Sequence, residues 1–282
     1  MTTPITLQTD TPLSLHHLHV TSDKPEALAA FYEDLFELKR VGHHGQAIVL
    51  AAGERAMVIH DGKPGELAAA AYAARDHEAL SRLRARLDDL AAAAPAAAGA
   101  FFHDDAFAVR DPQGRQLILG VARQPRSADR MAARVQHTVF QTTELEAVLD
   151  FYVKRIGFAV SDDVVDETGK VMTCFLRSDD EHHTLAFFRG SSNAWDHHCY
   201  ETQCWNDIRD WGDRFARARR SIFFGPGRHG PGNNLFFMVT DPDGNRVELS
   251  AELEQVEPAK LPGVWPHEEY TLNSWGRGWI RT

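Results

Sequence analysis

The stretch DPDGNRVEL, at residues 241–249, has a near copy in DPQGRQLIL, at residues 111–119. In both copies a proline presets a turn, a glycine permits the positive φ that the turn needs, and an apolar strand follows. The copies differ at one informative place, where Glu248 of the second stands opposite Ile118 of the first. A carboxylate on the apolar side of a strand is unusual and suggests a specific role for Glu248.

A second pair of segments shows that most of the chain is an internal repeat. HLHVTSDKPEALAAFY, at 17–32, matches HTVFQTTELEAVLDFY, at 137–152, and places His17 on His137. The offset is 120 residues here and 130 residues at the two turns, so the second copy carries extra residues. Insertions of this kind belong in loops.

Each copy is predicted to contain a strand, an amphipathic helix, further strands, a second helix and a closing strand. The apolar residues of 25–35 and 145–152 fall on one helical face, and second helices are predicted over roughly 76–93 and 204–219. The predicted strands are rich in β-branched and aromatic residues; they are AIVLAA, AMVIH, VMTCFLR, TLAFF and NLFFMVT. The Ala-rich stretch 90–100 is interpreted as a helix end broken by Pro95, followed by a loop.

These elements predict two domains and a tail. We expect an N-terminal domain over 1–128 without a metal and a C-terminal domain over 133–256 with a metal site. A polar linker over 122–133 would join them. A Trp-rich tail over 257–282 belongs to neither copy.

Composition excludes several classes of protein. A formal charge of −10 over 282 residues argues against a nucleic-acid partner, because such proteins need a basic surface to release counterions. Three irregularly spaced cysteines do not form a disulfide framework or a thiolate zinc site, so we expect reduced thiols. The sequence shows no signal-peptide pattern and no long apolar stretch. We therefore expect a cytoplasmic protein with no membrane contact.

Three residues of the second copy have the types expected of a metal site: His137, His197 and Glu248. Two imidazoles and one carboxylate on one face, with other coordination positions open, form the facial triad of non-haem Fe(II) enzymes. The first copy keeps His17 but has Ala69 and Ile118 at the other two positions. We infer one site that retains its ligands and one that has lost them.

The neighbouring histidine, His198, leaves the strand register open, because a shift by one residue turns a side chain to the other face of the sheet. We favour His197 as the residue that faces the metal, since Tyr200 and Thr202 then face the helix side.

The chain resembles the two-domain type I extradiol ring-cleaving dioxygenases of the vicinal oxygen chelate superfamily. The resemblance covers roughly 14–255 and is most specific in EHHTLAFF (181–188), HHCYET (197–202) and GRHGPGNNLFFMVTDPDGNRVEL (227–249). It implies an α+β fold with two tandem βαβββ modules in each domain copy. It also implies Fe(II), or less often Mn(II), held by His137, His197 and Glu248. A catechol-type diol and O₂ would be the partners, and His183 would be the catalytic acid/base residue.

One residue departs from the family. The resemblance implies a tyrosine three residues before the DPDG turn, and this chain has Met238, which has no hydroxyl group. The glycine-rich loop GPGRHGPGNN lacks the features of a phosphate loop and is expected at the pocket mouth. His229, Asn233 and Met238 are therefore the expected substrate-binding residues. The tail tryptophans are expected either to cover an aromatic substrate or to pack elsewhere.

Other functions stay open on the same fold. A glyoxalase-like lyase or isomerase, or a thiol transferase, would build its site from more than one module, whereas Ala69 and Ile118 leave the first copy unable to contribute. A metal-free small-molecule-binding protein would have degraded ligands in both copies. A dioxygenase acting on para-hydroquinones would use a similar metal site. We also expect a homo-oligomer.

Overall fold

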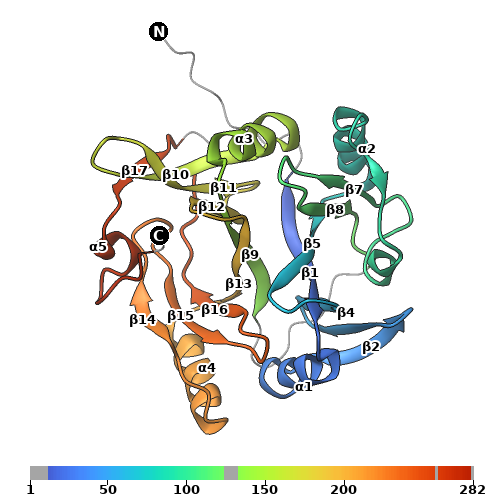
Figure 1. Ribbon diagram of the computed structural model, residues 1–282, viewed down its shortest axis with the longest axis horizontal. Helices are drawn as coiled ribbons and strands as arrows, with labels where there is room; N and C mark the ends of the chain where they lie inside the picture. The colour runs from blue at the N-terminus through green and yellow to red at the C-terminus, as the bar shows by residue number, and fades with distance from the viewer. Residues whose placement is uncertain (1–11, 124–132, 258–259, 281–282) are drawn as a thin grey trace.

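The computed structural model describes residues 12–123, 133–257 and 260–280. Two mixed β-sheets of eight and nine strands lie side by side, with helices packed outside them. Figure 1 shows the first half of the chain in blue to teal and the second half in green to red. The predicted linker, 122–133, lies almost entirely outside the described residues.

The first sheet has the strand order β2-β3-β4-β1-β5-β8-β7-β6. Its elements are β1 (Leu13–Ser22), α1 (Pro25–Phe36), β2 (Lys39–His44), β3 (Ala47–Ala52), β4 (Arg55–Asp61), β5 (Glu66–Ala74), α2 (His77–Arg86), β6 (Ala92–Ala93), the 3₁₀ helix η1 (Ala96–Ala100), β7 (Phe107–Arg110) and β8 (Gln116–Gly120). Helix α1 begins at Pro25, whose fixed φ suits a first helical turn, and ends where Glu37 takes a left-handed conformation.

The second sheet repeats this order and adds one strand, giving β14-β15-β16-β13-β9-β12-β11-β10-β17. Its elements are β9 (Arg134–Thr142), α3 (Leu145–Asp150), the π-helical segment η2 (Phe151–Ile156), β10 (Ala159–Val165), β11 (Val171–Arg177), β12 (Leu185–Arg189), β13 (Ala194–Thr202), α4 (Trp205–Arg217), β14 (Phe224–Arg228), β15 (Leu235–Thr240), β16 (Arg246–Ala251), β17 (Gly263–Pro266) and α5 (Glu269–Leu272).

Each sheet consists of two βαβββ units that meet through their first strands. In the first sheet the meeting strands are β1 and β5, and in the second they are β9 and β13, antiparallel in both cases. The predicted α+β class and the predicted modules are confirmed. Strand β17 comes from the tail and pairs in parallel with β10, so part of the tail belongs to the second sheet.

Two sequence predictions for the first domain were wrong. Helix α2 ends at Arg86 rather than near residue 93, because Ala92–Ala93 pairs with β7 as a short strand. The Ala-rich stretch is therefore not a helix end. It continues into η1, where Ala97 and Ala98 are buried against Phe101 and Phe102.

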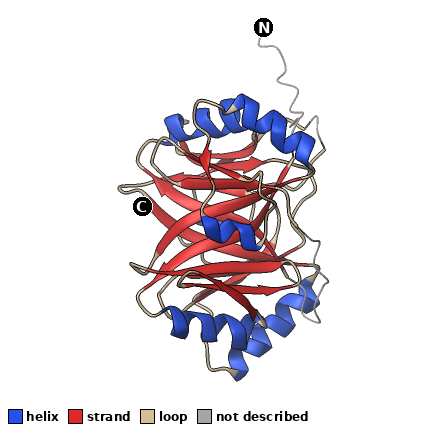
Figure 2. Ribbon diagram, turned by 90° about the vertical axis from the view of Figure 1, so that its right-hand side faces the viewer, coloured by secondary structure: helices blue, strands red, loops and turns tan. Residues whose placement is uncertain are grey.

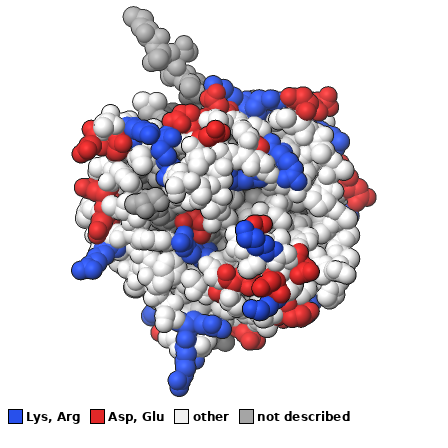
Figure 3. Space-filling model, viewed as in Figure 1, with Lys and Arg blue, Asp and Glu red and all other residues white. Residues whose placement is uncertain are grey.

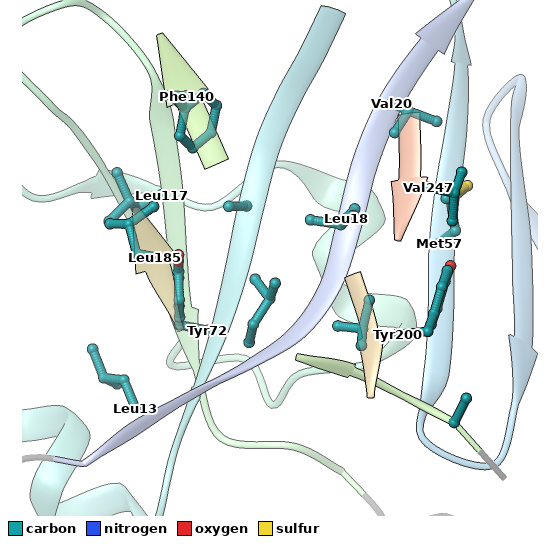
Figure 4. Packing of buried hydrophobic residues seen from close by; sticks show 14 of the residues in the cluster. Leu13, Leu18, Val20, Met57, Tyr72, Leu117, Phe140, Leu185, Tyr200 and Val247 are labelled. Atoms are coloured by element: carbon teal, nitrogen blue, oxygen red, sulfur yellow. The ribbon is translucent and has the colours of Figure 1, made fainter. Parts of the chain in front are cut away.

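The largest hydrophobic core is shared by the two domains. Figure 4 shows Leu18 and Tyr72 of the first sheet close to Leu185 and Tyr200 of the second, and one cluster contains residues of both. Helices from different domains also meet in pairs, since Arg214 of α4 bonds Glu37 after α1. This arrangement gives the molecule one continuous interior.

A reciprocal pair of hydrogen bonds crosses between the domains. The Tyr32 hydroxyl of α1 donates to Asp241 of the second DPxG turn (3.1 Å), and the Tyr152 hydroxyl donates to Asp111 of the first (3.4 Å). All four side chains are buried. Each turn carboxylate also accepts backbone N–H groups within its own turn, as Asp241 does from Asp243 and Asn245. Each DPxG turn therefore binds a tyrosine of the opposite domain.

Glu201 gives the fold a pH dependence. Burial raises the pKa of Glu201 from 4.5 to about 7, against the lowering effect of hydrogen bonds with Ser250 and the Leu253 N–H. The folded protein thus binds this proton more tightly than the unfolded chain. The stability that this provides is complete below pH 4.5 and is lost as the pH rises through about 7.

We expect Glu201→Gln to remove this dependence. Between pH 4.5 and 8 the free energy of unfolding of the native protein should fall by roughly 3 kcal/mol relative to the variant. Urea denaturation of both proteins at several pH values measures the difference. Parallel stability curves would show that Glu201 has an ordinary pKa in the folded state.

The surface carries mixed charge. On the face seen in Figure 3, acidic and basic side chains are interspersed, and no large basic patch is visible there. Within the described parts of the chain, no helix is long and apolar enough to cross a membrane. Cys174, Cys199 and Cys204 form no disulfide, which agrees with the predicted reduced thiols.

Candidate metal centre

Three adjacent strands, β9, β13 and β16, bring the predicted ligands together. In the sheet register Cys199 lies opposite both His137 and Glu248, and His197 is two residues along the same strand. His137, His197 and Glu248 all line one cavity, whereas His198 contacts Tyr32 on the other face of the sheet. The structure thus places His197, not His198, in the cavity.

Neighbouring side chains fix the orientation of both imidazoles. His137 Nδ1 lies 2.6 Å from Gln136 Oε1, and the amide of Gln136 is itself oriented by donating to the His183 carbonyl oxygen (2.5 Å). His197 Nδ1 lies 2.6 Å from Asp196 Oδ1. Each Nδ1 therefore carries the proton and each Nε2 keeps its lone pair. Metal-binding histidines in proteins are oriented in the same way.

Glu248 is buried and faces several partners. Its Oε2 lies 3.5 Å from His197 Nε2 and 3.8 Å from His229 Nε2, while its Oε1 accepts from Asn234 Nδ2 (3.3 Å). A buried carboxylate close to imidazole nitrogens is costly unless a cation or proton is shared among them. The arrangement fits a divalent cation.

Cys199 belongs to the same cluster, which the sequence analysis missed. Within the described part of the chain, donor atoms of His137, Cys199 and Glu248 lie within 4.8 Å of one another, and this group could hold a metal ion. The Cys199 thiol donates a hydrogen bond to Glu248 Oε1 over 3.9 Å. Burial raises the pKa of this thiol well above its ordinary value. Its position two residues after His197 on a strand was the signal that could have found it.

Burial also controls the protonation of the histidines in the cavity. It holds the pKa of His137 well below the ordinary value, and the nearby His183 and His197 lower it further. The pKa of His183 is lowered in the same way by burial and by His182. The rings of His137 and His183 lie 4.5 Å apart, centre to centre. Both imidazoles are therefore neutral at physiological pH and can offer lone pairs.

The remaining cavity wall is largely apolar, and the tail completes it. Met238 lies opposite Glu248 in the sheet register and packs on Phe224 and Phe236. His229 donates from Nδ1 to the Leu272 carbonyl oxygen of the tail (2.5 Å), which leaves its Nε2 facing Glu248. Residues lining the wall include Val139, Met172, Thr173, Phe175, Ala186, Phe188, Arg189, Pro231, His267, Thr271 and Leu272.

The prediction that Asn233 lines the cavity is not met, and the tail tryptophans follow the second of their two expected arrangements, packing elsewhere. Asn233 is exposed, in a left-handed turn conformation, and does not line the cavity; the adjacent Asn234 reaches Glu248 instead. None of the tail tryptophans lines the cavity. Trp265 bonds Asp162, Trp275 packs on Trp205, and Trp279 packs on Phe223.

In the first domain the corresponding positions have different side chains. Ala69 pairs with His19, and Ile118 lies opposite Ala71, so the positions matching His197 and Glu248 carry apolar side chains. Rings of Phe101 and Phe102 then pack on His17, with centres 4.6 and 4.9 Å away. Phenylalanine rings fill the space that is a cavity in the second domain.

Comparison with solved structures defines the fold. The Mn(II)-bound glyoxalase from Novosphingobium aromaticivorans matches with a TM-score of 0.81 at 22% identity, covering 95% of this chain and 92% of that one. The 2,3-dioxygenase LapB from Pseudomonas sp. KL28 matches with a TM-score of 0.82 at 18% identity, covering 92% and 99%. The chain has the glyoxalase/extradiol dioxygenase fold.

Sequence comparison finds a family similarity in the second domain. Residues 134–249 match the model of the Glyoxalase/Bleomycin resistance protein/Dioxygenase superfamily. Metapyrocatechase 2 of Cupriavidus necator is 28% identical over 51% of this chain and 44% of its own length, and metapyrocatechase of Pseudomonas sp. (strain CF600) is 30% identical over 42% and 39%. These matches span less than half of each relative. The family match lies within the second domain, at residues 134–249.

Proposed function

We propose that this protein is an extradiol dioxygenase that opens the aromatic ring of a catechol-type diol with O₂. The observation that supports it most is the pair of Nδ1-anchored histidines beside the buried carboxylate of Glu248, at the base of an apolar cavity. Relatives named metapyrocatechase and biphenyl-2,3-diol 1,2-dioxygenase support the same activity.

We propose His137, His197 and Glu248 as the metal ligands and Fe(II) as the metal, with Mn(II) as the alternative. Imidazole and carboxylate donors suit these ions, whereas the thiol of Cys199 would favour softer ones. When bound, such a metal supplies open coordination positions for a diol and O₂. The ligands all come from the second domain.

The other residues of the cavity have distinct proposed tasks. The apolar wall around Phe175, Phe188 and Met238 would bind the aromatic ring and exclude water. His183, neutral and buried beside His137, would accept and return a proton of the diol. His229 would hold the substrate or a diol oxygen near Glu248. With Met238 in the wall, a substrate hydroxyl would find no tyrosine partner there.

Oxygen uptake tests the proposal. Protein purified anaerobically and quantified for iron and manganese would be given catechols, dihydroxybiphenyls and hydroquinones, with the yellow ring-opened product followed by absorbance. Stoichiometric metal with O₂ consumption on an ortho-diol is expected. Turnover of para-diols only would assign the hydroquinone chemistry instead. Bound metal with no uptake on any diol would overturn the proposal and favour a lyase or isomerase, and absence of metal would favour a binding protein.

We also propose that the protein is a homo-oligomer. Leu261, Val264 and Tyr270 of the tail are 74, 69 and 65% exposed, which is unusual for side chains of this size.

A further inference from the structure

His182 contacts His183 and has no role in the proposed function described above. His182 is completely buried, and its Nδ1 lies 3.0 Å from Nδ1 of His183. At its other edge, Nε2 lies 3.1 Å from Asp162 Oδ2. This contact is an ion-pair distance and not a well-formed hydrogen bond, and among the described residues Nε2 has no hydrogen-bond partner. Asp162, His182 and His183 therefore form a chain of polar contacts that leads to the cavity.

The tail holds Asp162 in place. Its Oδ1 accepts the Gly263 backbone N–H (2.9 Å), and its Oδ2 accepts the Trp265 indole N–H (2.7 Å). Position 263 must be glycine, since a Cβ there would lie 2.5 Å from Asp162 Oδ1. Burial alone would raise the pKa of Asp162, but the contacts with His182, Trp265 and Gly263 keep it below the ordinary value. The carboxylate is ionised at neutral pH.

An ionised Asp162 determines which nitrogens carry protons. A lone pair on His182 Nε2 would face the carboxylate oxygen at 3.1 Å and be repelled, so the geometry places the ring proton of His182 on Nε2. Its Nδ1 is then an acceptor. The contact at 3.0 Å requires His183 to donate from Nδ1, which leaves the lone pair of His183 on Nε2, at the ring edge away from His182.

We propose that Asp162 and His182 are positioning residues that hold His183 in the Nδ1–H tautomer, with its Nε2 lone pair available to take a proton in the cavity. The inference rests on the proposed function for the catalytic role of His183, but the tautomer itself does not. The proposal also gives the tail a role, because Gly263 and Trp265 of β17 hold the Asp162 carboxylate in place. A similar carboxylate–histidine arrangement fixes the tautomer of the base in serine proteases.

Nitrogen NMR tests the tautomer directly. Protein with ¹⁵N-labelled histidine and bound Zn²⁺, which is diamagnetic, would be compared with His183→Gln to assign the signals. We expect His183 to appear as the Nδ1–H tautomer in the native protein. In Asp162→Ala and His182→Phe the same ring should shift toward the Nε2–H form. An Nε2–H His183 in the native protein, or an unchanged tautomer in both variants, would overturn the inference.

Kinetics provide the second readout. Asp162→Ala and His182→Phe should lower kcat about 10- to 100-fold, the usual cost of removing a residue that orients a functional histidine, while KM for the diol and metal content stay unchanged. Trp265→Phe should act in the same direction but less, because the Gly263 N–H still holds Asp162. His182→Asn, which keeps an acceptor near the position of Nδ1, should recover part of the lost activity.

A matched control is available on the surface of the first domain. His77 and Asp105 form a similar pair, with His77 Nδ1 2.6 Å from Asp105 Oδ2, and both side chains are largely exposed. His77→Phe should leave kcat and the tautomer of His183 unchanged. A native protein that is inactive on every diol but shows the Nδ1–H tautomer would refute the proposed function alone. An active protein with an Nε2–H His183 would refute the positioning role alone.

Discussion

Alanine at His137, His197 or Glu248 is expected to remove the bound metal and the oxygen uptake together. Each residue is a proposed ligand and is buried, so each variant would leave only two of the three proposed donors. The metal affinity should fall by more than about 100-fold, the largest loss usually seen for residues that merely orient a ligand. Metal analysis after dialysis and oxygen electrode traces measure both effects.

Glu252→Ala is the control for this set. Glu252 is also an acidic residue just after β16, but it is exposed and pairs with Arg228 (2.9 Å) away from the cavity. It should keep metal and activity. Retention of metal in all three ligand variants would show that the ion binds elsewhere, and retention in His197→Ala alone would point to Cys199 as the third donor.

Replacing His183 by glutamine should separate chemistry from metal binding. We expect kcat to fall about 10²- to 10⁴-fold, the range for loss of a positioned acid/base group, because glutamine cannot accept and return a proton as an imidazole can. Metal content should stay at the native level, since His183 is 4.5 Å from His137 between ring centres but is not among the proposed ligands. Steady-state oxygen uptake and metal analysis on the same preparation provide the comparison.

Two outcomes would contradict this role. A native kcat would show that proton transfer does not pass through His183. Loss of metal along with activity would make His183 a ligand, and the ligand set would need revision. His77→Phe, described above as a surface control, should be indistinguishable from the native protein in both measurements.

The sequence was informative wherever the repeat compared one copy with the other. The offset between copies identified His17, Ala69 and Ile118 as the matches of His137, His197 and Glu248, and the sheet registers agree with this alignment. Strands with strong β-branched and aromatic content, such as Val171–Arg177, were also located closely. The local pattern of residue types is sufficient to locate such strands and to align the two copies.

Contacts between distant segments could not be predicted in this way. Asn234 rather than Asn233 reaches Glu248 because a left-handed residue at 233 ends the preceding loop, and a pattern of residue types does not reveal that turn. The wall formed by Thr271 and Leu272 depends on a tail without a counterpart in the first copy. Helix α2 was predicted too long, because alanine favours helices and only the pairing with β7 makes Ala92–Ala93 a strand.

The reciprocal bonds of Tyr32 with Asp241 and of Tyr152 with Asp111 bear on how the two domains depend on each other. Each of the two similar copies now forms part of the interior of the other, so a change that unfolds one domain destabilises both. In the first domain Phe101 and Phe102 belong to a buried apolar cluster, and the domain still supplies part of the shared core. A truncation that begins at residue 133 would expose the shared core, so the second domain needs the first in order to fold.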